Sequence, residues 1–193
     1  SMGKEIIVIT MGDPAGVGAE VILKAFADDA LWRGIRPVVF GDLARLVTVA
    51  DEVNILVEPV AVGSLVEAEG EYPRLEVLDF GNVRADLPFG KGTAETGRAA
   101  IAYIEAAAQA ATSGAVEAVV TAPISKESIR AAGSPYTGHT DMLAALTNCR
   151  RYAMTLVADE LRTIFVTAHI PIAEVPKAVT RERVRETIEL AAE

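Results

Sequence analysis

The sequence predicts an α/β protein in which a parallel or mixed sheet lies between layers of helices. Short β-rich runs alternate along the chain with segments of helical periodicity. Several of these runs, such as Ile6–Ile9 and Ala118–Val120, are apolar at successive positions instead of at every second position. Strands of a parallel sheet have this pattern because helices cover both of its faces. A chain of 193 residues can bury a sizeable core, as one large domain or as two small ones.

Individual elements are predicted from residue type and spacing. The predicted strands are Glu5–Thr10, Pro37–Phe40, Asn54–Val57, Leu75–Asp79, Ala118–Thr121, Ala153–Val157 and Thr163–Thr167. The predicted helices are Val17–Ala27, Thr93–Thr112, Ser125–Ala131, Thr140–Leu146 and a last one that Thr180 caps and that runs to Glu193. The longest of them carries an apolar stripe at helical spacing and ends at Gly114. We expect Glu67–Pro73 and Asp86–Gly92 to be flexible connections.

Both ends of the chain carry signals of their own. Ser1–Met2 is typical of the remnant of a cleaved expression tag. The last helix reaches Glu193 without a Gly or Pro to stop it. We therefore expect residues 3–193 to be the amino-terminal part of a longer protein.

Composition and charge exclude two classes of partner. The net charge is −9, and no basic cluster beyond Arg150–Arg151 offers a face for nucleic acid. No apolar run approaches the roughly 20 residues that a membrane helix needs, and no signal peptide is recognisable. Cys149 is the only cysteine, so no internal disulfide can form, and a cytoplasmic location is expected. We expect Cys149 to be a buried or idle thiol. A small phosphorylated ligand remains compatible with the acidic charge.

The first motif, Thr10–Gly18, joins a buried strand to a helix. Its glycines let the backbone turn tightly and approach a ligand, and the helix start offers unpaired N–H groups. It is neither a Walker A loop nor a dinucleotide fingerprint, because it lacks G-K-[ST] and G-x-G-x-x-G. Two interpretations stay open for Asp13. It caps the helix, or it projects into the cleft at the carboxyl end of its strand, where α/β sheets place ligands.

The second motif, Thr121–Lys126, ends another buried strand and turns at Pro123. It delivers Lys126 to the same edge of the sheet. A lysine there can neutralise a phosphate or carboxylate, or act as an acid if desolvation lowers its pKa. The alternative is a solvated lysine in the first turn of the helix Ser125–Ala131.

The third motif, Tyr136–Asp141, places His139 directly before Thr140, which is predicted to cap a helix. The start of a helix attracts anions, and imidazole and hydroxyl add two donors that suit a phosphate or an alcohol oxygen. A turn histidine without any function is the alternative.

The fourth motif, Thr167–Pro171, puts His169 at the carboxyl end of a strand. A single histidine is more often structural than a metal ligand, and the chain contains only two histidines. Metals usually take three or more protein ligands. If His169 binds a metal, the other ligands come from carboxylates, from a partner chain or from sequence beyond this chain.

These four motifs, in this order, resemble the 4-hydroxythreonine-4-phosphate dehydrogenase family of pyridoxal phosphate synthesis. The matching stretches are Ile9–Gly18, Thr121–Lys126, Gly138–Asp141 and Thr167–Pro171. Each stretch is a weak signal alone, whereas four in order with compatible spacing are a strong one. The resemblance covers essentially the whole chain after Met2.

The resemblance implies an isocitrate/isopropylmalate-dehydrogenase-like α/β/α sandwich, truncated here at its carboxyl side. It also implies a homodimer whose active sites borrow residues from both subunits. His139 and Thr140 would contact substrate, and His169 would bind a divalent metal ion (Zn, Mg or Co). Two further metal histidines, later substrate contacts and most of the nucleotide site would lie beyond residue 193, so this fragment is expected to be inactive. For Asp13 and Lys126, location and chemistry alone indicate catalytic roles.

The implied reaction is a metal- and NAD(P)-dependent oxidation of 4-phosphohydroxy-L-threonine, a small phosphorylated hydroxy acid. The metal would make the hydroxyl proton easier to lose, and NAD or NADP would take the hydride. The resulting 3-keto acid could then lose carbon dioxide. A sister branch, which acts on 4-phospho-D-threonate or 4-phospho-D-erythronate, shares the motifs. The segments Met11–Pro14 and Arg151–Met154 resemble that branch at least as closely.

Two alternatives from other functional classes stay open. A phosphate-acetyltransferase-like acyltransferase has a similar architecture and binds phosphorylated ligands without a metal, so His169 would have no ligand role. A domain kept for dimerisation or ligand binding would have no enzymatic role. Metal-dependent hydride transfer by the full-length protein would exclude the first alternative.

Overall fold

The computed structural model describes residues 3–84 and 86–192, which form two compact units. The first unit ends at Thr147, and the second begins at Asn148. The tag remnant expected at Ser1–Met2 and the final residue of the last predicted helix, Glu193, lie outside the described residues. Within the described part of the chain, no helix is both long enough and apolar enough to cross a membrane.

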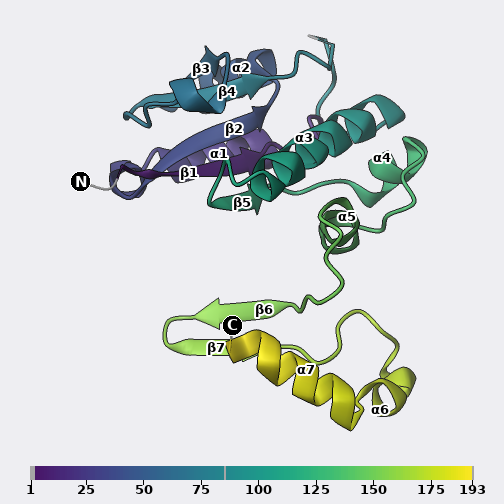
Figure 1. The fold of residues 1–193 in the computed structure, drawn as a ribbon. Coiled ribbons are helices and arrows are strands. Elements are labelled where there is room, and N and C mark those ends of the chain that lie inside the picture. Colours follow the sequence, from purple (N-terminus) through teal and green to yellow (C-terminus); the bar gives the residue numbers. More distant parts are fainter. Residues whose placement is uncertain (1–2, 85, 193) are drawn as a thin grey trace. The chain divides into compact units, whose positions relative to one another are not determined.

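The first unit is built on a five-stranded parallel sheet in the order β3-β4-β2-β1-β5 (Figure 1). The strands are β1 (Glu5–Thr10), β2 (Ile35–Gly41), β3 (Glu58–Val62), β4 (Arg74–Asp79) and β5 (Ala118–Thr121). Val8 lies opposite Val38 on one side and opposite Val119 on the other. Val8 and Val38 are fully buried, as expected for strands covered on both faces. The predicted α/β fold with a parallel sheet is confirmed.

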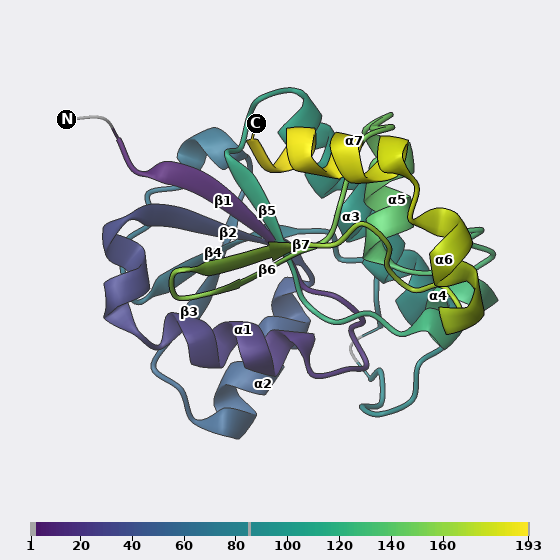
Figure 2. The ribbon, with the colours of Figure 1, turned by 90° about the horizontal axis from the view of Figure 1, so that it is seen from below.

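Helices cover both faces of this sheet. The chain moves in one direction along the sheet through α1 (Gly18–Phe26) and α2 (Leu43–Val53), and back through α3 (Ala94–Thr112). Right-handed crossovers then place α1 and α2 on one face and α3 on the other, as Figure 2 shows. The core includes residues of α3 such as Tyr103 and Ala107, both fully buried. Two 3₁₀ segments, η1 (Asp29–Arg33) and η2 (Leu65–Glu67), complete the connections.

Two short helices extend this unit beyond the sheet. They are α4 (Lys126–Ala131) and α5 (His139–Leu146). A small hydrophobic cluster joins them to α3 through Ile104, Ile129 and Met142, one from each helix and all nearly inaccessible to solvent. The position of α5, and therefore of His139, depends on this cluster.

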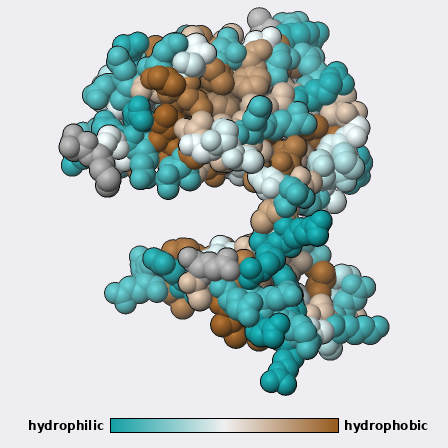
Figure 3. Space-filling model, viewed as in Figure 1, coloured by the Kyte–Doolittle hydropathy of each residue, from teal (hydrophilic) through white to brown (hydrophobic). Residues whose placement is uncertain are grey.

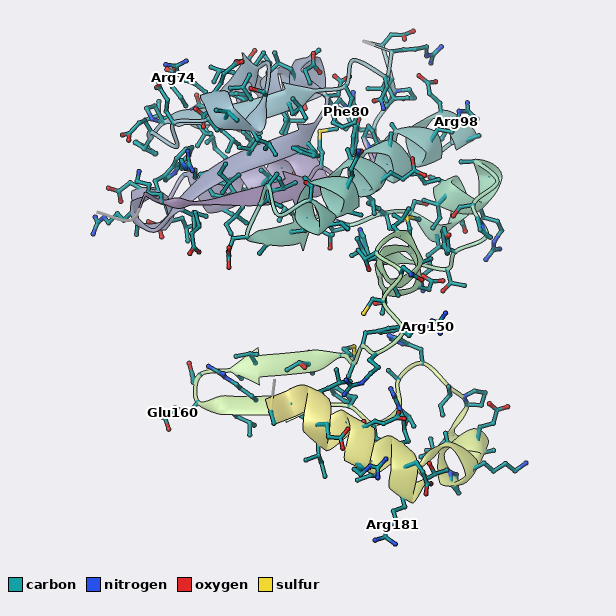
Figure 4. The ribbon with its side chains drawn as sticks, viewed as in Figure 1. Arg74, Phe80, Arg98, Arg150, Glu160 and Arg181 are labelled. Atoms are coloured by element: carbon teal, nitrogen blue, oxygen red, sulfur yellow. The ribbon has the colours of Figure 1, made fainter. Side chains whose placement is uncertain are left out.

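The second unit consists of a β-hairpin and three helical segments. Strands β6 (Thr155–Ala158) and β7 (Leu161–Ile164) pair antiparallel. The helical segments are η3 (Ile172–Glu174), α6 (Val175–Ala178) and α7 (Arg181–Ala192). Figure 3 shows hydrophobic residues at the surface of this unit, and its exposed apolar side chains include Leu156, Val157 and Leu161. Figure 4 marks the hairpin turn by Glu160.

One predicted strand is absent, and one helix was not predicted. No strand covers Asn54–Val57. Asn54 adopts a left-handed conformation (φ 51°) that ends α2, and the strand begins only at Glu58. Asparagine tolerates this conformation, so it acted here as a helix stop. The helix α2 itself was not predicted. The last two predicted strands exist with shifted bounds, but they form the separate hairpin instead of joining the parallel sheet.

Candidate functional site

The candidate site lies at the carboxyl ends of β1 and β5, where neighbouring strands send their chains to opposite faces of the sheet. The chain leaves β1 toward α1 and leaves β5 toward α4, which packs on α3. Ligands of α/β proteins bind at such switch points. The two loops touch, because the Asp13 N–H donates to the Pro123 carbonyl oxygen at 3.0 Å. Gly12 permits the approach. Its φ is +75°, and a Cβ there would lie 2.2 Å from the Pro123 oxygen.

Asp13 is almost fully buried between these loops, with 4% of its surface exposed. Its Oδ1 accepts from the Ala15 N–H at 2.8 Å, and its Oδ2 accepts from the Thr96 hydroxyl at 3.2 Å. The interpretation of Asp13 as a helix cap is wrong, because Val17 is the N-cap of α1 and receives no side-chain bond. The carboxylate instead ties the β1–α1 loop to the first turn of α3. That leaves the prediction of a catalytic Asp13 without direct support in its contacts.

Hydroxyl residues near Gly92, which were not predicted as site residues, lie next to Asp13. A Cβ at Gly92 would lie 2.1 Å from Ser128 Oγ and 3.4 Å from both Asp13 Oδ2 and Ser125 Oγ. Thr93 and Ser125 are the N-caps of α3 and α4. The local signal was present, since each capping residue is followed three positions later by another hydroxyl residue, Thr96 or Ser128. What the sequence could not indicate is that the two helix starts meet.

An aromatic cluster supports this edge of the sheet. Phe80, labelled in Figure 4, follows β4, and its ring centroid lies 5.9 Å from that of Phe40 and 5.1 Å from that of Tyr103. The Tyr103 hydroxyl donates to Asn82 Oδ1 at 2.9 Å. Burial is the main cause that raises the pKa of Tyr103 above its ordinary range, and the negative charge of the nearby Asp42 adds to it. This phenol therefore stays protonated. The cluster is therefore structural.

Lys126 is the first residue of α4 and is exposed to solvent. The prediction that its motif ends at the same edge as Asp13 is confirmed, because the Asp13–Pro123 hydrogen bond joins the two loops. An exposed ammonium at this position is free to meet an anionic ligand that arrives from solvent.

The prediction that Thr140 caps α5 is wrong, because Gly138 is the N-cap and His139 and Thr140 are the first two helical residues. Asp141 already occupies part of this helix start. The Asp141 carboxylate accepts from Thr137 N–H and Oγ1–H (2.6 and 2.9 Å), from Gly138 N–H (3.0 Å) and from Met142 N–H (3.1 Å). Partial burial raises its pKa, but these hydrogen bonds outweigh burial and hold the pKa below its ordinary value. An anion at this helix start therefore competes with a fixed carboxylate, and fewer backbone donors remain for it than the sequence predicted.

The His139 side chain is half-buried, and its Nε2 is enclosed without a hydrogen-bond partner. Burial lowers the pKa of His139, so the imidazole is neutral at neutral pH. Thr140 is exposed, and its hydroxyl can turn toward a ligand. Neither residue contacts Asp13 or Lys126 by a hydrogen bond among those found in the described chain.

Four buried side-chain polar atoms of the described residues have no hydrogen-bond partner. Among the described residues they are Thr10 Oγ1, Arg45 Nη2, Ser128 Oγ and His139 Nε2. Thr10 ends β1, Arg45 lies just after β2, and Ser128 and His139 follow β5. Proteins satisfy nearly all buried polar groups, so a ligand or water is expected to complete the bonding of each of these atoms.

His169 belongs to the second unit, in the segment that follows β7. It is exposed, and its backbone is left-handed with φ 59°. Within residues 3–84 and 86–192, no three His, Cys, Asp or Glu side chains are grouped so as to hold a metal ion. The described residues thus do not make a complete metal site, and His169 offers one imidazole. Cys149 is exposed rather than buried, and its thiol donates to the Arg151 carbonyl oxygen at 3.2 Å.

Comparisons with solved structures show the same fold in dehydrogenases. A 4-hydroxythreonine-4-phosphate dehydrogenase from Burkholderia phymatum is 41% identical with a TM-score of 0.90, over 96% of this chain and 56% of that one. The enzyme of that name from Klebsiella pneumoniae is 33% identical with a TM-score of 0.91, over 100% and 59%.

Curated relatives carry two names at equal similarity. The 4-hydroxythreonine-4-phosphate dehydrogenase of Trichlorobacter lovleyi is 39% identical over 98% of this chain and 57% of its own length. The D-threonate 4-phosphate dehydrogenase of Cupriavidus necator is 39% identical over 95% and 55%. The chain thus spans little more than half the length of the relatives it matches. Residues 33–193 match the family described as pyridoxal phosphate biosynthetic protein PdxA. Because this match covers most of the chain, the protein belongs to the PdxA family.

Proposed function

We propose that this chain is part of a dehydrogenase that oxidises a small phosphorylated hydroxy acid with NAD or NADP. The carrying observation is that relatives of both names, each at 39% identity, align along nearly the whole chain. The unpaired polar atoms at the carboxyl edge of the sheet support a ligand site in the same place. The substrate is 4-phosphohydroxy-L-threonine, with oxidation and decarboxylation, or 4-phospho-D-threonate in the sister reaction.

The side chains of the first unit are proposed to bind and orient this substrate. The neutral His139 imidazole can donate or accept one hydrogen bond at its enclosed Nε2. The exposed Thr140 hydroxyl and the exposed Lys126 ammonium can meet the phosphate or carboxylate. Asp13, whose two oxygens are engaged by Ala15 and Thr96, is proposed to act by holding the loops in place rather than by transferring a proton.

The proposed metal needs residues from outside the described part of this chain. His169 is proposed as one ligand of a zinc, magnesium or cobalt ion, and a homodimer or a longer chain would supply the others. One exposed imidazole cannot hold a divalent ion tightly. We therefore expect this chain alone to lose zinc on dialysis, which elemental analysis would detect. Stoichiometric zinc that survives dialysis would contradict this ligand assignment.

The decisive experiment measures hydride transfer by the full-length protein that contains this chain. Either phosphorylated substrate should reduce NAD or NADP in a metal-dependent way, and the ratio of kcat/KM for the two substrates assigns the branch. The 193-residue chain alone should show no turnover, because it spans only 57% of a typical relative. Acyl transfer to phosphate without any hydride transfer would replace this proposal by the acyltransferase alternative.

A further inference from the structure

Arg45 lies in the first turn of α2, where a positive charge is unfavourable. It is the third residue of α2, and its N–H donates at 3.0 Å to the carboxylate of Asp42, the N-cap. A positive charge in the first turn of a helix opposes the helix dipole. Arg45 is moreover only 5% exposed, and burial lowers the pKa of its guanidinium despite the nearby Glu52 and Asp42. A residue that violates two local preferences is expected to make compensating contacts elsewhere.

The guanidinium of Arg45 joins two loops that are distant in sequence. Its Nε donates to the Pro14 carbonyl oxygen at 2.8 Å, and its Nη1 donates to the Leu87 carbonyl oxygen at 2.7 Å. The half-exposed ring of Phe89 covers the group, with 3.5 Å from its centroid to the guanidinium carbon. Next to this contact, the Gly90 N–H donates to the Ala15 carbonyl oxygen at 2.8 Å. Segment 86–92, expected from its sequence to be flexible, is therefore fastened to the β1–α1 loop.

Both fastened loops lead directly to the candidate site. Pro14 follows Asp13, whose carboxylate faces Thr96. Segment 86–92 ends at Gly92, which lies against Asp13, Ser125 and Ser128. We propose that Arg45 is a positioning residue that sets where Asp13 and Gly92 lie, and so determines how well the site binds its substrate. The functional half of this proposal rests on the proposed dehydrogenase activity, whereas the structural half does not.

Lysine cannot replace Arg45 in this role. A single ammonium nitrogen cannot span two carbonyl groups in the fixed geometry of a guanidinium, and it does not stack flat on a ring. Arg36, near the amino end of β2, provides a matched control away from the site. Its Nε donates to the Lys4 carbonyl oxygen at 2.8 Å and its Nη1 to the Ala68 carbonyl oxygen at 3.3 Å. Each arginine thus joins two backbone segments, but only Arg45 does so beside the site.

The structural half is tested by amide hydrogen exchange on the 193-residue chain. We expect Arg45→Lys to speed exchange of the Gly90 N–H at least about tenfold, while Val39 in the core keeps its protection. Trypsin should also cleave faster after the exposed Lys91. Arg36→Lys should leave both readouts unchanged. Phe89→Leu, which removes only the stacked ring, should give a smaller increase in the same direction. Unchanged Gly90 exchange in folded Arg45→Lys would overturn the proposal.

The functional half is tested by kinetics of the full-length protein. Arg45→Lys should lower kcat/KM at least about tenfold, mainly by raising KM, whereas Arg36→Lys should change it less than about twofold. If Gly90 exchange rises while KM and kcat stay unchanged, Arg45 is merely structural and the proposal fails. If the unmodified enzyme shows no hydride transfer at all, the proposed function fails instead, and the exchange measurement alone decides whether Arg45 fixes the loops.

Discussion

The parallel sheet has an amino edge and a carboxyl edge, where its strands begin and end. The two edges use the same kinds of contact but differ in which buried polar atoms they leave unpaired. At the amino edge, Arg36 joins two backbone segments, and the buried Glu76 carboxylate accepts from the N–H groups of Glu69 and Gly70 at 2.7 and 3.0 Å. At the carboxyl edge, Arg45 and Asp13 make the equivalent contacts. The four buried unpaired atoms of the described side chains nevertheless all lie on elements that follow the carboxyl ends of the strands, or at such an end itself. Buried polar groups are normally paired, so a polar ligand or water at the carboxyl edge would satisfy these four atoms.

Replacing one glycine at each edge by alanine should give the largest difference in unfolding free energy between the two edges. Gly12→Ala places a Cβ 2.2 Å from the Pro123 oxygen at a φ of +75°, so we expect a loss of about 3 kcal/mol or more in the free energy of unfolding. Gly34, just before β2, has a φ of −105° and nothing within 4 Å of a Cβ. Gly34→Ala should be neutral or stabilise by about 0.5 kcal/mol. Urea denaturation measures both, and equal effects would show that the close loop contact is absent.

Neutral replacement of the two buried carboxylates should separate stability from activity. Asp13→Asn and Glu76→Gln each weaken two hydrogen bonds to a charged acceptor, so each should cost about 2 kcal/mol in unfolding free energy. Only Asp13→Asn should also lower kcat/KM of the full-length protein, by about tenfold or more. A comparable loss of activity in Glu76→Gln would mean that the edges do not differ in function.

The pH dependence of stability tests the burial of the unpaired His139 Nε2. Burial lowers the pKa of His139 below its ordinary value of 6.5, so the unfolded chain binds the proton more readily than the folded one. The stability due to this group is present above pH 6.5 and is lost as the pH falls through the lowered pKa. His139→Gln should therefore flatten the decline in the urea midpoint between about pH 7 and 5. His169→Gln, at the exposed histidine, is the control. A flattened profile in the control alone would contradict the burial of His139.

The smallest effect on stability is expected at Lys126. Because its side chain is exposed, Lys126→Ala should change the unfolding free energy by less than about 0.5 kcal/mol. In the full-length protein it should still raise KM for a phosphorylated substrate, and this effect should shrink with added salt. Lys24→Ala on α1, which removes an exposed ion pair with Glu20, should leave KM unchanged. An unaffected KM in Lys126→Ala would indicate a solvated lysine without a role at the site.

Much of the first unit could be predicted because its local and tertiary signals agree. The bounds of β1 and β5 match their apolar runs, and Thr93 caps α3 as its spacing suggests. The strand predicted at Asn54–Val57 was wrong because the apolar residues after Asn54 indicated a strand, whereas Asn54 itself ends the helix α2. The pairing of the hairpin in the second unit could not be predicted, because short apolar runs do not reveal which strand they pair with.

The candidate site was predicted only where it is local in sequence. The loops at Asp13 and Lys126 carry turn residues after buried strands, and parallel strands bring such loops to one edge. Arg45 gave no signal, because an arginine in the first turn of an amphipathic helix resembles any solvated residue until its distant carbonyl partners are known. The same holds for Ser128, whose burial depends on the meeting of two helix starts.

The left-handed backbone of His169 decides which mutant can report on its imidazole. Residues with a Cβ are strained at a φ of 59°, by roughly 1 kcal/mol, and β-branched ones more so. Valine at this position would reshape the chain as well as remove the ring, while glycine would relieve strain and loosen the segment. Asparagine, which accepts this conformation readily, removes the imidazole and keeps the local path of the chain. Any change in metal affinity caused by His169→Asn can then be attributed to the missing imidazole, rather than to a displaced loop.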